Sequence, residues 1–115
     1  MQNSIYIRRF MTYETKADLF HILSHPVRLQ ILDELRRREA CVCHLQAVTG
    51  RPQAYVSQQL RILRDAGAVV DEKDGQNVFY HLRSDEVRLL LQETLGEPGE
   101  PAHPLGCQCP LCAHD

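Results

Sequence analysis

No long run of apolar residues occurs in this sequence of 115 residues, and its longest runs, AGAVV and LLL, are short. A helix that spans a bilayer needs about 20 apolar residues in succession, so we expect no membrane span. The first residues, MQNSIYIRRFMTYETK, also lack the continuous apolar segment of a secretion signal. We therefore expect a cytoplasmic protein. In that reducing compartment, clustered cysteines indicate metal binding or thiol chemistry rather than a disulfide scaffold.

An excess of basic residues is also missing, because 15 Asp and Glu outnumber 13 Lys and Arg and give a net charge of −2. Taken alone, this charge argues against a nucleic-acid partner. The charges are unevenly distributed, however. Residues 1–83 hold 12 Lys and Arg against 9 Asp and Glu, whereas residues 84–115 hold 1 against 6. The acidity belongs to the C-terminal part, so the rest of the chain can still face phosphates.

The sequence contains no recognisable catalytic arrangement. No phosphate-binding loop and no pairing of a nucleophile with a base stands out, and Ser57 lies on a predicted helix without a catalytic partner nearby in the sequence. We predict that the protein is not an enzyme and has no small-molecule substrate.

Helix and turn signals predict one small domain. We expect a first helix over residues 14–24 and a second helix that starts after Ser24, with Pro26 in its first turn. A short third helix runs from about Cys43 to Thr49 and ends at Gly50, and a long fourth helix runs from Pro52 to Gly67. A hairpin around Asp74 and Gly75 follows, and then a last helix capped by Ser84. The short third helix, the turn after it and the long fourth helix predict a helix-turn-helix, and the hairpin beside them predicts a wing. The fold class is therefore mainly α with a β-hairpin wing (α+β).

The long fourth helix is the predicted DNA-reading element. Its apolar residues Val56, Leu60 and Leu63 recur at the spacing of an inward face, which leaves polar side chains for base edges and phosphates. The residues that we expect to contact double-stranded DNA, on this helix and at the wing, are Arg51, Gln53, Tyr55, Ser57, Gln58, Gln59, Arg61, Arg64, Lys73, Gln76 and Asn77.

These elements divide the chain into three parts. Residues 1–13 form an N-terminal arm or helix, and residues 14–95 form the winged helix-turn-helix domain for DNA binding and dimerisation. Residues 96–115 form a linker rich in Pro and Gly, followed by a cysteine-rich metal-binding tail.

All five cysteines fall in two clusters, Cys41 and Cys43 in EACVCHL and Cys107, Cys109 and Cys112 in GCQCPLC. Residues i and i+2 of a regular helix point about 200° apart, so Cys41 and Cys43 can bind one ion only where the helix begins or is unwound. A helix N-terminus also favours the thiolate, the form of cysteine that binds metals. The linker of about 11 residues spans up to roughly 30 Å, so the tail cysteines can reach the upstream pair within one subunit or across a dimer.

Thiolates select soft ions, so Cd(II), Pb(II), As(III), Zn(II) and Cu(I) are all admissible. Three thiolates suit As(III) or Pb(II), and four suit Cd(II) or Zn(II). Five thiolates exceed the ligands of one such ion, which leaves one idle or places a separate ion in the tail. His44 beside Cys43, and His103 and His114 near the tail, are candidate further ligands, whereas His25 is expected to cap a helix and pack.

The stretches HPVRLQIL, EACVCHL and YVSQQLRILRDAGAV and the glycine-turn wing that ends in VFYHL closely resemble the ArsR/SmtB family of small bacterial metal-responsive repressors, over about residues 14–95. The resemblance implies a winged-helix homodimer that binds operator DNA and releases it when a metal ion binds. Cys41 and Cys43 match the family's Cys-Val-Cys sensing motif, and His44 stands where that motif usually has Asp. The first and last helices normally form the dimer interface, for which the candidates here are Phe10, Phe20, Leu89, Leu90, Leu91 and Leu95. The other metal site of the family needs histidine on the last helix, and SDEVRLLLQETLGE contains none.

Two other functions stay open. Thiols that lie close together can form a disulfide or polysulfide, which would make the protein a redox or sulfide sensor with the same fold. Alternatively, the protein is a metal carrier or buffer whose DNA-binding face is vestigial. A DNA-binding assay with metals and oxidants separates these functions.

Overall fold

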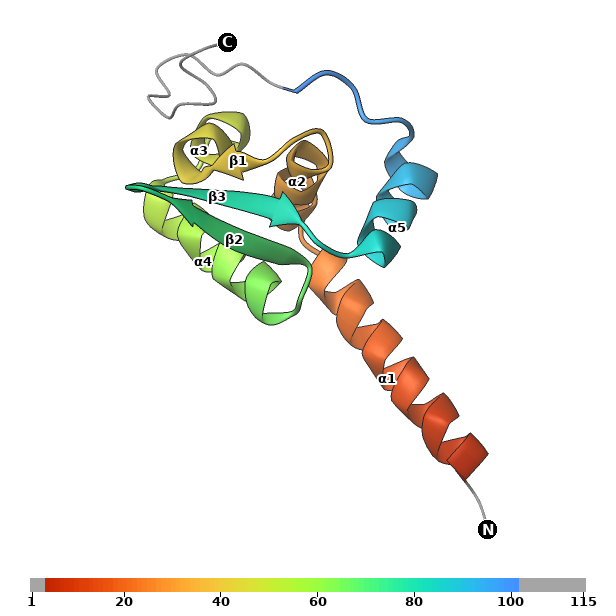
Figure 1. The fold of residues 1–115 in the computed structure, drawn as a ribbon. Helices are drawn as coiled ribbons and strands as arrows, with labels where there is room; N and C mark the ends of the chain where they lie inside the picture. Colours follow the sequence, from red (N-terminus) through yellow and green to blue (C-terminus); the bar gives the residue numbers. More distant parts are fainter. Residues whose placement is uncertain (1–3, 102–115) are drawn as a thin grey trace.

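The computed structural model describes residues 4–101, with side chains from residue 12 onward. Its elements are α1 (Ser4–Leu23), α2 (Pro26–Leu35), β1 (Ala40–Cys41), α3 (Val42–Thr49), α4 (Gln53–Asp65), β2 (Val69–Asp74), β3 (Asn77–Leu82) and α5 (Asp85–Leu95) (Figure 1). This order confirms the mainly helical fold with a β-hairpin wing. Within the described residues no helix is both long and apolar enough to cross a membrane.

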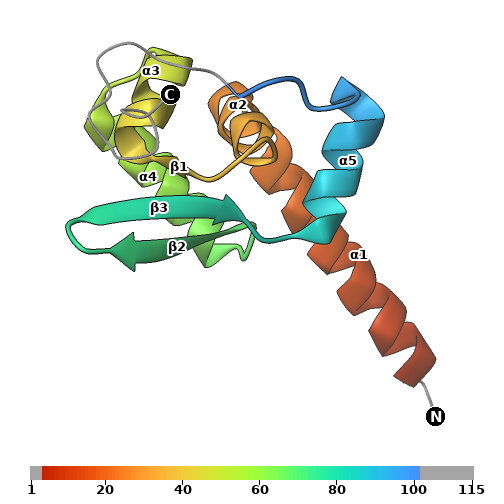
Figure 2. The ribbon, with the colours of Figure 1, turned by 45° about the horizontal axis from the view of Figure 1, so that its top comes forward.

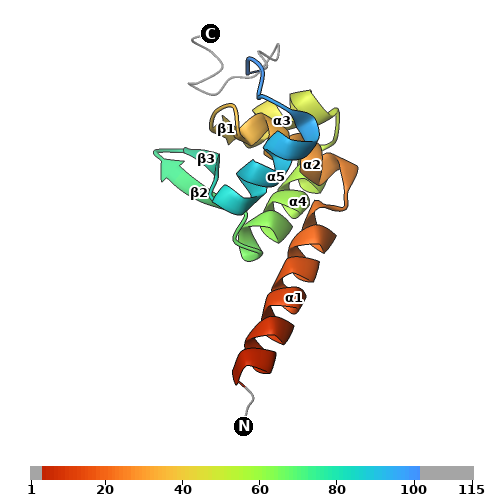
Figure 3. The ribbon, with the colours of Figure 1, turned by 90° about the vertical axis from the view of Figure 1, so that its right-hand side faces the viewer.

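Helix α1 is longer than the sequence predicted. We expected a helix over residues 14–24 behind an arm or helix over residues 1–13, and one continuous helix runs from Ser4 to Leu23. The sequence between these residues contains neither Pro nor Gly, so nothing interrupts the helix. Its C-terminal end packs against the body through Leu19, Ile22 and Leu23, while the N-terminal half extends away from it (Figure 3).

The helix boundaries follow the predicted local signals. Pro26 occupies the first turn of α2, and Nδ1 of His25 accepts a hydrogen bond from the backbone N–H of Arg28, which confirms His25 as a capping residue. Gly50 ends α3 with a φ of +70°, a left-handed conformation that glycine adopts without strain. The Ser84 side chain caps α5 by accepting from the N–H of Val87.

One apolar core holds the helices and the sheet together. Val56, Leu60 and Leu63 are all 0% exposed, as predicted for the inward face of α4. The other core side chains come from α2, α3, the strands and α5, and they are Val27, Ile31, Leu32, Leu35, Ala40, Leu45, Ala68, Val69, Leu82, Val87 and Leu91. Burial of this apolar surface is the main stabilising contribution to the fold.

The sheet has three antiparallel strands in the order β1-β3-β2. The β2–β3 hairpin projects from the body as the wing (Figure 2). Asp74 pairs with Asn77, so the two turn residues are Gly75, with a φ of +64°, and Gln76. The turn therefore lies one residue beyond the predicted Asp74–Gly75 centre. Strand β1 was not predicted at all, and it joins the wing to the segment that enters α3.

Candidate metal centre and nucleic-acid interface

The upstream cysteines lie where a strand changes into a helix. Cys41 is the last residue of β1 and also the N-cap of α3, with an extended backbone (φ −88°, ψ 170°), and Cys43 lies in the first helical turn. Their Sγ atoms are 3.2 Å apart, which is longer than an S–S bond of about 2.05 Å and short enough for both to bind one ion. The pair therefore meets the geometric condition that its spacing imposed, because Cys41 is outside the regular helix.

This position connects the cysteine pair to both DNA-binding elements. Cys41 pairs across the sheet with Phe79 of β3, which belongs to the wing. On its other side the chain continues through α3 and the Gly50 turn directly into α4. The cysteine pair is therefore adjacent to the wing through β1 and to the helix-turn-helix through α3.

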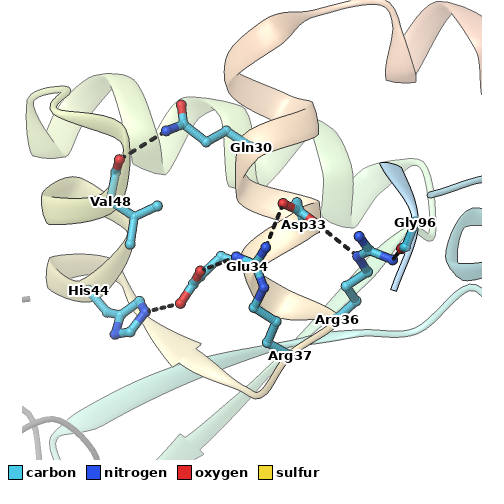
Figure 4. A network of polar contacts seen from close by, with 8 residues as sticks. All are labelled: Gln30, Asp33, Glu34, Arg36, Arg37, His44, Val48 and Gly96. Atoms are coloured by element: carbon cyan, nitrogen blue, oxygen red, sulfur yellow. Dashed lines mark hydrogen bonds and ion pairs between the residues drawn. The ribbon is translucent and has the colours of Figure 1, made fainter. Parts of the chain in front are cut away.

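His44, the candidate further ligand, is 1% exposed and makes a buried hydrogen bond. Its Nε2 atom lies 2.7 Å from Oε2 of Glu34, which is also 1% exposed (Figure 4). Gln30 of α2 makes a second link to α3 by donating to the carbonyl of Val48 at 2.9 Å. The contact between Nε2 of His44 and Glu34 joins α3 to α2.

The Glu34 carboxylate begins a chain of polar contacts along α2 (Figure 4). Its Oε1 accepts from Arg37, which also pairs with Asp33 at 3.0 Å. Asp33 in turn accepts from Nε of Arg36 at 2.7 Å, and Nη1 of Arg36 donates to the carbonyl of Gly96 at 2.7 Å. This network joins α3 to the end of α5. The charged run DELRRRE in the sequence was its only signal, because His44 and Gly96 are distant in sequence.

The polar residues predicted to read DNA differ in their exposure. Arg51, Gln53, Gln58, Arg61, Arg64, Lys73 and Gln76 are exposed, and Tyr55, Ser57 and Asn77 are half-buried. Gln59 differs from the prediction that it contacts DNA, because its side chain is only 6% exposed. It lies next to the inward stripe of Val56, Leu60 and Leu63 on the helix, so it faces the core and not the outer surface.

Several of these side chains already have partners within the chain. The Tyr55 hydroxyl lies 3.3 Å from Nε2 of His25, and the Arg51 guanidinium lies 5.3 Å from the centroid of the Tyr55 ring. Arg64 pairs with Asp71 of β2 at 3.4 Å, which offsets part of its charge.

Burial raises the pKa of the Tyr80 hydroxyl, and the Asp71 carboxylate raises it further, while Arg64 lowers it.

Helices α1 and α5 carry the candidate dimer interface. Phe20 is 57% exposed, Leu89 67% and Leu95 50%, so these two helices expose several large apolar side chains. Leu91 differs from the prediction that it lies in the dimer interface, because it is 1% exposed and belongs to the core of the single chain. Leu90 is half-buried, and the side chain of Phe10 lies outside the described part.

A cavity of about 430 Å³ separates the two helices near the start of α5, and its lining includes Leu19, Ile22 and Val87. Lys16 of α1 pairs with Glu86 of α5 at its rim. Cys107, Cys109 and Cys112, the predicted tail ligands, lie outside the described residues, as do His103 and His114.

A helix-turn-helix built from α3 and α4, with a β-hairpin wing beside it, defines a winged helix-turn-helix protein. The profile of the bacterial regulatory protein family arsR matches residues 25–70. The chain is 40% identical over 77 residues to a transcriptional repressor SmtB homolog of Synechocystis, and the match covers 67% of this chain and 58% of that protein. The chain therefore belongs to the arsR family, and its named relatives are transcriptional regulators and not enzymes.

Solved structures show the same fold. Reduced HlyU from Vibrio cholerae matches with a TM-score of 0.71 and 31% identity, over 78% of this chain and 98% of that one. The homodimeric winged helix-turn-helix DNA-binding domain of Mb0332 from Mycobacterium bovis also has a TM-score of 0.71, with 26% identity, and the match covers 82% and 84% of the two chains. The chain spans 58–66% of the length of the SmtB proteins that it matches.

Proposed function

We propose that this protein is a transcriptional repressor that binds operator DNA in the metal-free state and releases it when a soft metal ion or metalloid binds its cysteine thiolates. The observation that carries the proposal is the 3.2 Å separation of the Cys41 and Cys43 Sγ atoms at the junction of β1 and α3. Tail residues Cys107, Cys109 and Cys112 supply the remaining ligands in this proposal.

The geometry of the cysteine pair suits ions with narrow bond angles. With metal–sulfur bonds of about 2.3 Å, two sulfurs at this separation subtend about 90° at the ion. This angle is typical of a pyramidal ion with a lone pair, such as As(III) or Pb(II), and one tail thiolate completes its three ligands. A tetrahedral ion such as Cd(II) or Zn(II) needs wider separation and two tail thiolates.

Release of DNA requires that the ion binds more tightly to a conformation that does not fit the operator. Cys41 belongs to β1, which pairs with wing strand β3, and Cys43 belongs to α3, which holds α4. An ion that draws these sulfurs toward the tail thiolates displaces β1 and α3 relative to one another. The wing and α4 then lose the relative placement that two successive DNA contacts need.

DNA binding in this proposal uses the exposed side of α4 and the wing tip. Gln53 and Gln58 are exposed near the start of α4 and suit hydrogen bonding to base edges, as glutamine does to adenine. Arg51 and Arg61 contact phosphates and make the affinity dependent on salt. Ser57, Tyr55 and Arg64 on α4, with Lys73, Gln76 and Asn77 at the wing, supply further contacts.

The repressor acts as a homodimer in this proposal. The exposed apolar side chains of Phe20, Leu89 and Leu95 lie on α1 and α5, and apolar surface of this kind favours a partner subunit. The homodimeric relative from Mycobacterium bovis supports the same assembly. Two subunits also present two copies of α4, as two half-sites of an operator require.

The test is a metal titration of the reduced, full-length protein on its upstream promoter DNA, followed by fluorescence anisotropy for As(III), Pb(II), Cd(II) and Zn(II). Wild type is compared with Cys41→Ser and with a chain truncated before Cys107. Gln108→Ala is the matched control, because it alters the tail but keeps all five cysteines and the candidate histidine ligands. We expect one ion to release DNA from wild type and the control but not from the other two chains.

The thiol pair also supports a second candidate, a redox switch. In the reduced protein, two thiols held about as close as the Sγ atoms of Cys41 and Cys43 can lose two protons and two electrons to a peroxide and form a disulfide, while the peroxide is reduced to water. If peroxide or polysulfide releases the DNA and no ion does, the metal proposal is wrong. If the protein binds ions but no DNA, it is a metal carrier or buffer.

A further inference from the structure

Three metal-ligating side chains meet on the wing, apart from the cysteines. Nδ1 of His81 lies 3.2 Å from a carboxylate oxygen of Glu39, and Nε2 lies 3.1 Å from a carboxylate oxygen of Glu72. One ligand atom from each of the three residues can be chosen so that all lie within 4.8 Å of one another. His81 is 31% exposed, Glu39 39% and Glu72 71%, so solvent and ions reach the cluster.

The strand register explains why these residues converge. Ala40 pairs with Tyr80, so the preceding Glu39 falls beside His81, the next residue of β3. Glu72 pairs with Phe79, which is two residues before His81 on β3. All three side chains therefore lie on the same side of the sheet. This side is opposite the face that carries Val69 and Leu82 into the core.

The charge of this sheet face favours a cation. Alternation along the strands places seven side chains on it, namely Cys41, Val70, Glu72, Asp74, Asn77, Phe79 and His81. Among these described strand residues none is Lys or Arg, whereas two are acidic, and Glu39 at the edge is a third carboxylate. Two carboxylates beside one imidazole, with the third carboxylate of Asp74 farther along the same face, favour the binding of a cation.

We propose that Glu39, Glu72 and His81 bind one divalent cation of intermediate hardness, such as Zn(II), Co(II) or Ni(II), at a site separate from the thiolates. Imidazole and carboxylate are the ligands that these ions accept in the absence of sulfur. Nε2 of His81 faces Glu72, so the ion replaces that hydrogen bond, and rotation of the half-exposed Glu39 side chain turns its carboxylate from Nδ1 toward the same ion. Small rotations of the exposed Glu72 side chain complete the coordination, with water as a further ligand.

The two sites differ in the ions that they select and in what the ions connect. The thiolates take soft ions, while the nitrogen and oxygen set on the wing takes harder ones. An ion on the wing site joins the segment before β1 to both wing strands. Because Glu39 is two residues from Cys41, this ion would hold strand β1, which ends at Cys41, against β3.

The test uses Co(II) as the probe with the reduced, full-length protein. Equilibrium dialysis gives the number of ions bound, and absorption spectroscopy reports whether sulfur is a ligand, because thiolate ligation adds intense sulfur-to-metal charge-transfer bands. We compare wild type with His81→Gln, Glu72→Gln and Glu39→Gln. Asp74→Asn is the matched control, since it removes a carboxylate from the same face outside the cluster. Circular dichroism checks the fold of each variant.

We expect His81→Gln to bind one Co(II) fewer than wild type with unchanged charge-transfer bands. Glu72→Gln and Glu39→Gln should weaken the binding of that ion by about tenfold or more, and Asp74→Asn should not. Glu72 is highly exposed, so its variant remains informative if His81→Gln does not fold. The proposal is overturned if His81→Gln binds as much Co(II) as wild type, if its thiolate bands disappear with the lost ion, or if Asp74→Asn weakens binding equally.

Discussion

His44 of α3 and Glu34 of α2 form a fully buried hydrogen-bonded pair, with 2.7 Å between Nε2 and Oε2. Because His44 directly follows Cys43, the pair fixes the start of α3 next to the thiol site. Glu34 also connects this point, through Arg37, to the polar network that reaches Gly96. Cys43 therefore lies on a helix that side-chain hydrogen bonds join to α2, whereas Cys41 lies on a strand of two residues that pairs only with β3.

The buried pair predicts that two substitutions of Glu34 destabilise the protein by different amounts. Glu34→Ala should lower the free energy of unfolding by about 2 kcal/mol, because it leaves buried polar partners unsatisfied, and the isosteric Glu34→Gln by about 1 kcal/mol. Urea denaturation at fixed protein concentration measures both. Glu93→Ala on exposed α5 surface is the control, with a change within about 0.5 kcal/mol. Equal effects of Glu34→Ala and the control would contradict the role of the pair.

Neighbouring glutamines on α4 should behave in opposite ways. Gln58→Ala should weaken operator binding by about tenfold and leave the free energy of unfolding unchanged, because Gln58 is exposed. Gln59→Ala should leave operator affinity unchanged, since Gln59 is buried and its Oε1 has no hydrogen-bond partner among the described residues. Anisotropy at one fixed salt concentration gives both affinities. If Gln59→Ala weakens binding as much as Gln58→Ala, α4 does not present the face described above.

The arginines of the helix-turn-helix should differ in their effect on the salt dependence of binding. Arg61→Ala should reduce the slope of log affinity against log salt by about 1, as expected for the loss of one phosphate contact. Arg64→Ala should reduce it less, because Arg64 already pairs with Asp71. Titrations at several salt concentrations measure the two slopes, and a larger change for Arg64→Ala would reverse the assignment.

Two leucines of α5 should separate dimerisation from core packing. Leu89→Ala should shift the monomer–dimer equilibrium toward monomer, because Leu89 is 67% exposed on the single chain. Leu91→Ala should instead lower the free energy of unfolding by about 2–5 kcal/mol, as for other leucines removed from a core. Sedimentation equilibrium gives the first quantity and urea denaturation the second. A Leu89→Ala protein with unchanged dimerisation would exclude this part of α5 from the interface.

Tyr80 predicts a loss of stability in alkaline solution. Its pKa is raised in the folded protein, first by burial and then by Asp71. The folded state therefore favours the neutral hydroxyl, so this contribution to stability is complete below the unfolded pKa of about 10 and is lost as the pH rises through the folded pKa. Above pH 10, wild type should lose more of its free energy of unfolding than Tyr80→Phe. Parallel curves for the two proteins would contradict this.

The sequence predicted those features that depend on residues close together in the chain. Pro26, Gly50 and Ser84 marked helix boundaries that the structure confirms, and the spacing of Val56 and Leu60 identified the inward face of α4. These signals are local, so the physical cause and its effect lie within one turn of helix.

Features that depend on distant partners were not predictable in this way. Strand β1 has two residues and forms only because Ala40 and Cys41 pair with residues of β3 almost forty positions away. The Glu34 contacts depend on His44 lying opposite α2. Gln59 and Leu91 each flank an inward stripe, and only the packing of other elements decides on which side of the boundary they lie.

In the proposed sensor, strand β1 would also control how quickly an ion reaches Cys41, whose side chain is 6% exposed. The strand is short and lies at the edge of the sheet, where it pairs with β3 alone. Edge segments of this kind open by local fluctuation at a small fraction of the free energy of global unfolding. Transient opening of β1 would expose the Cys41 side chain while the core stays intact, so in the proposed sensor the rate of ion binding would depend on the local opening of two residues and not on the stability of the whole domain.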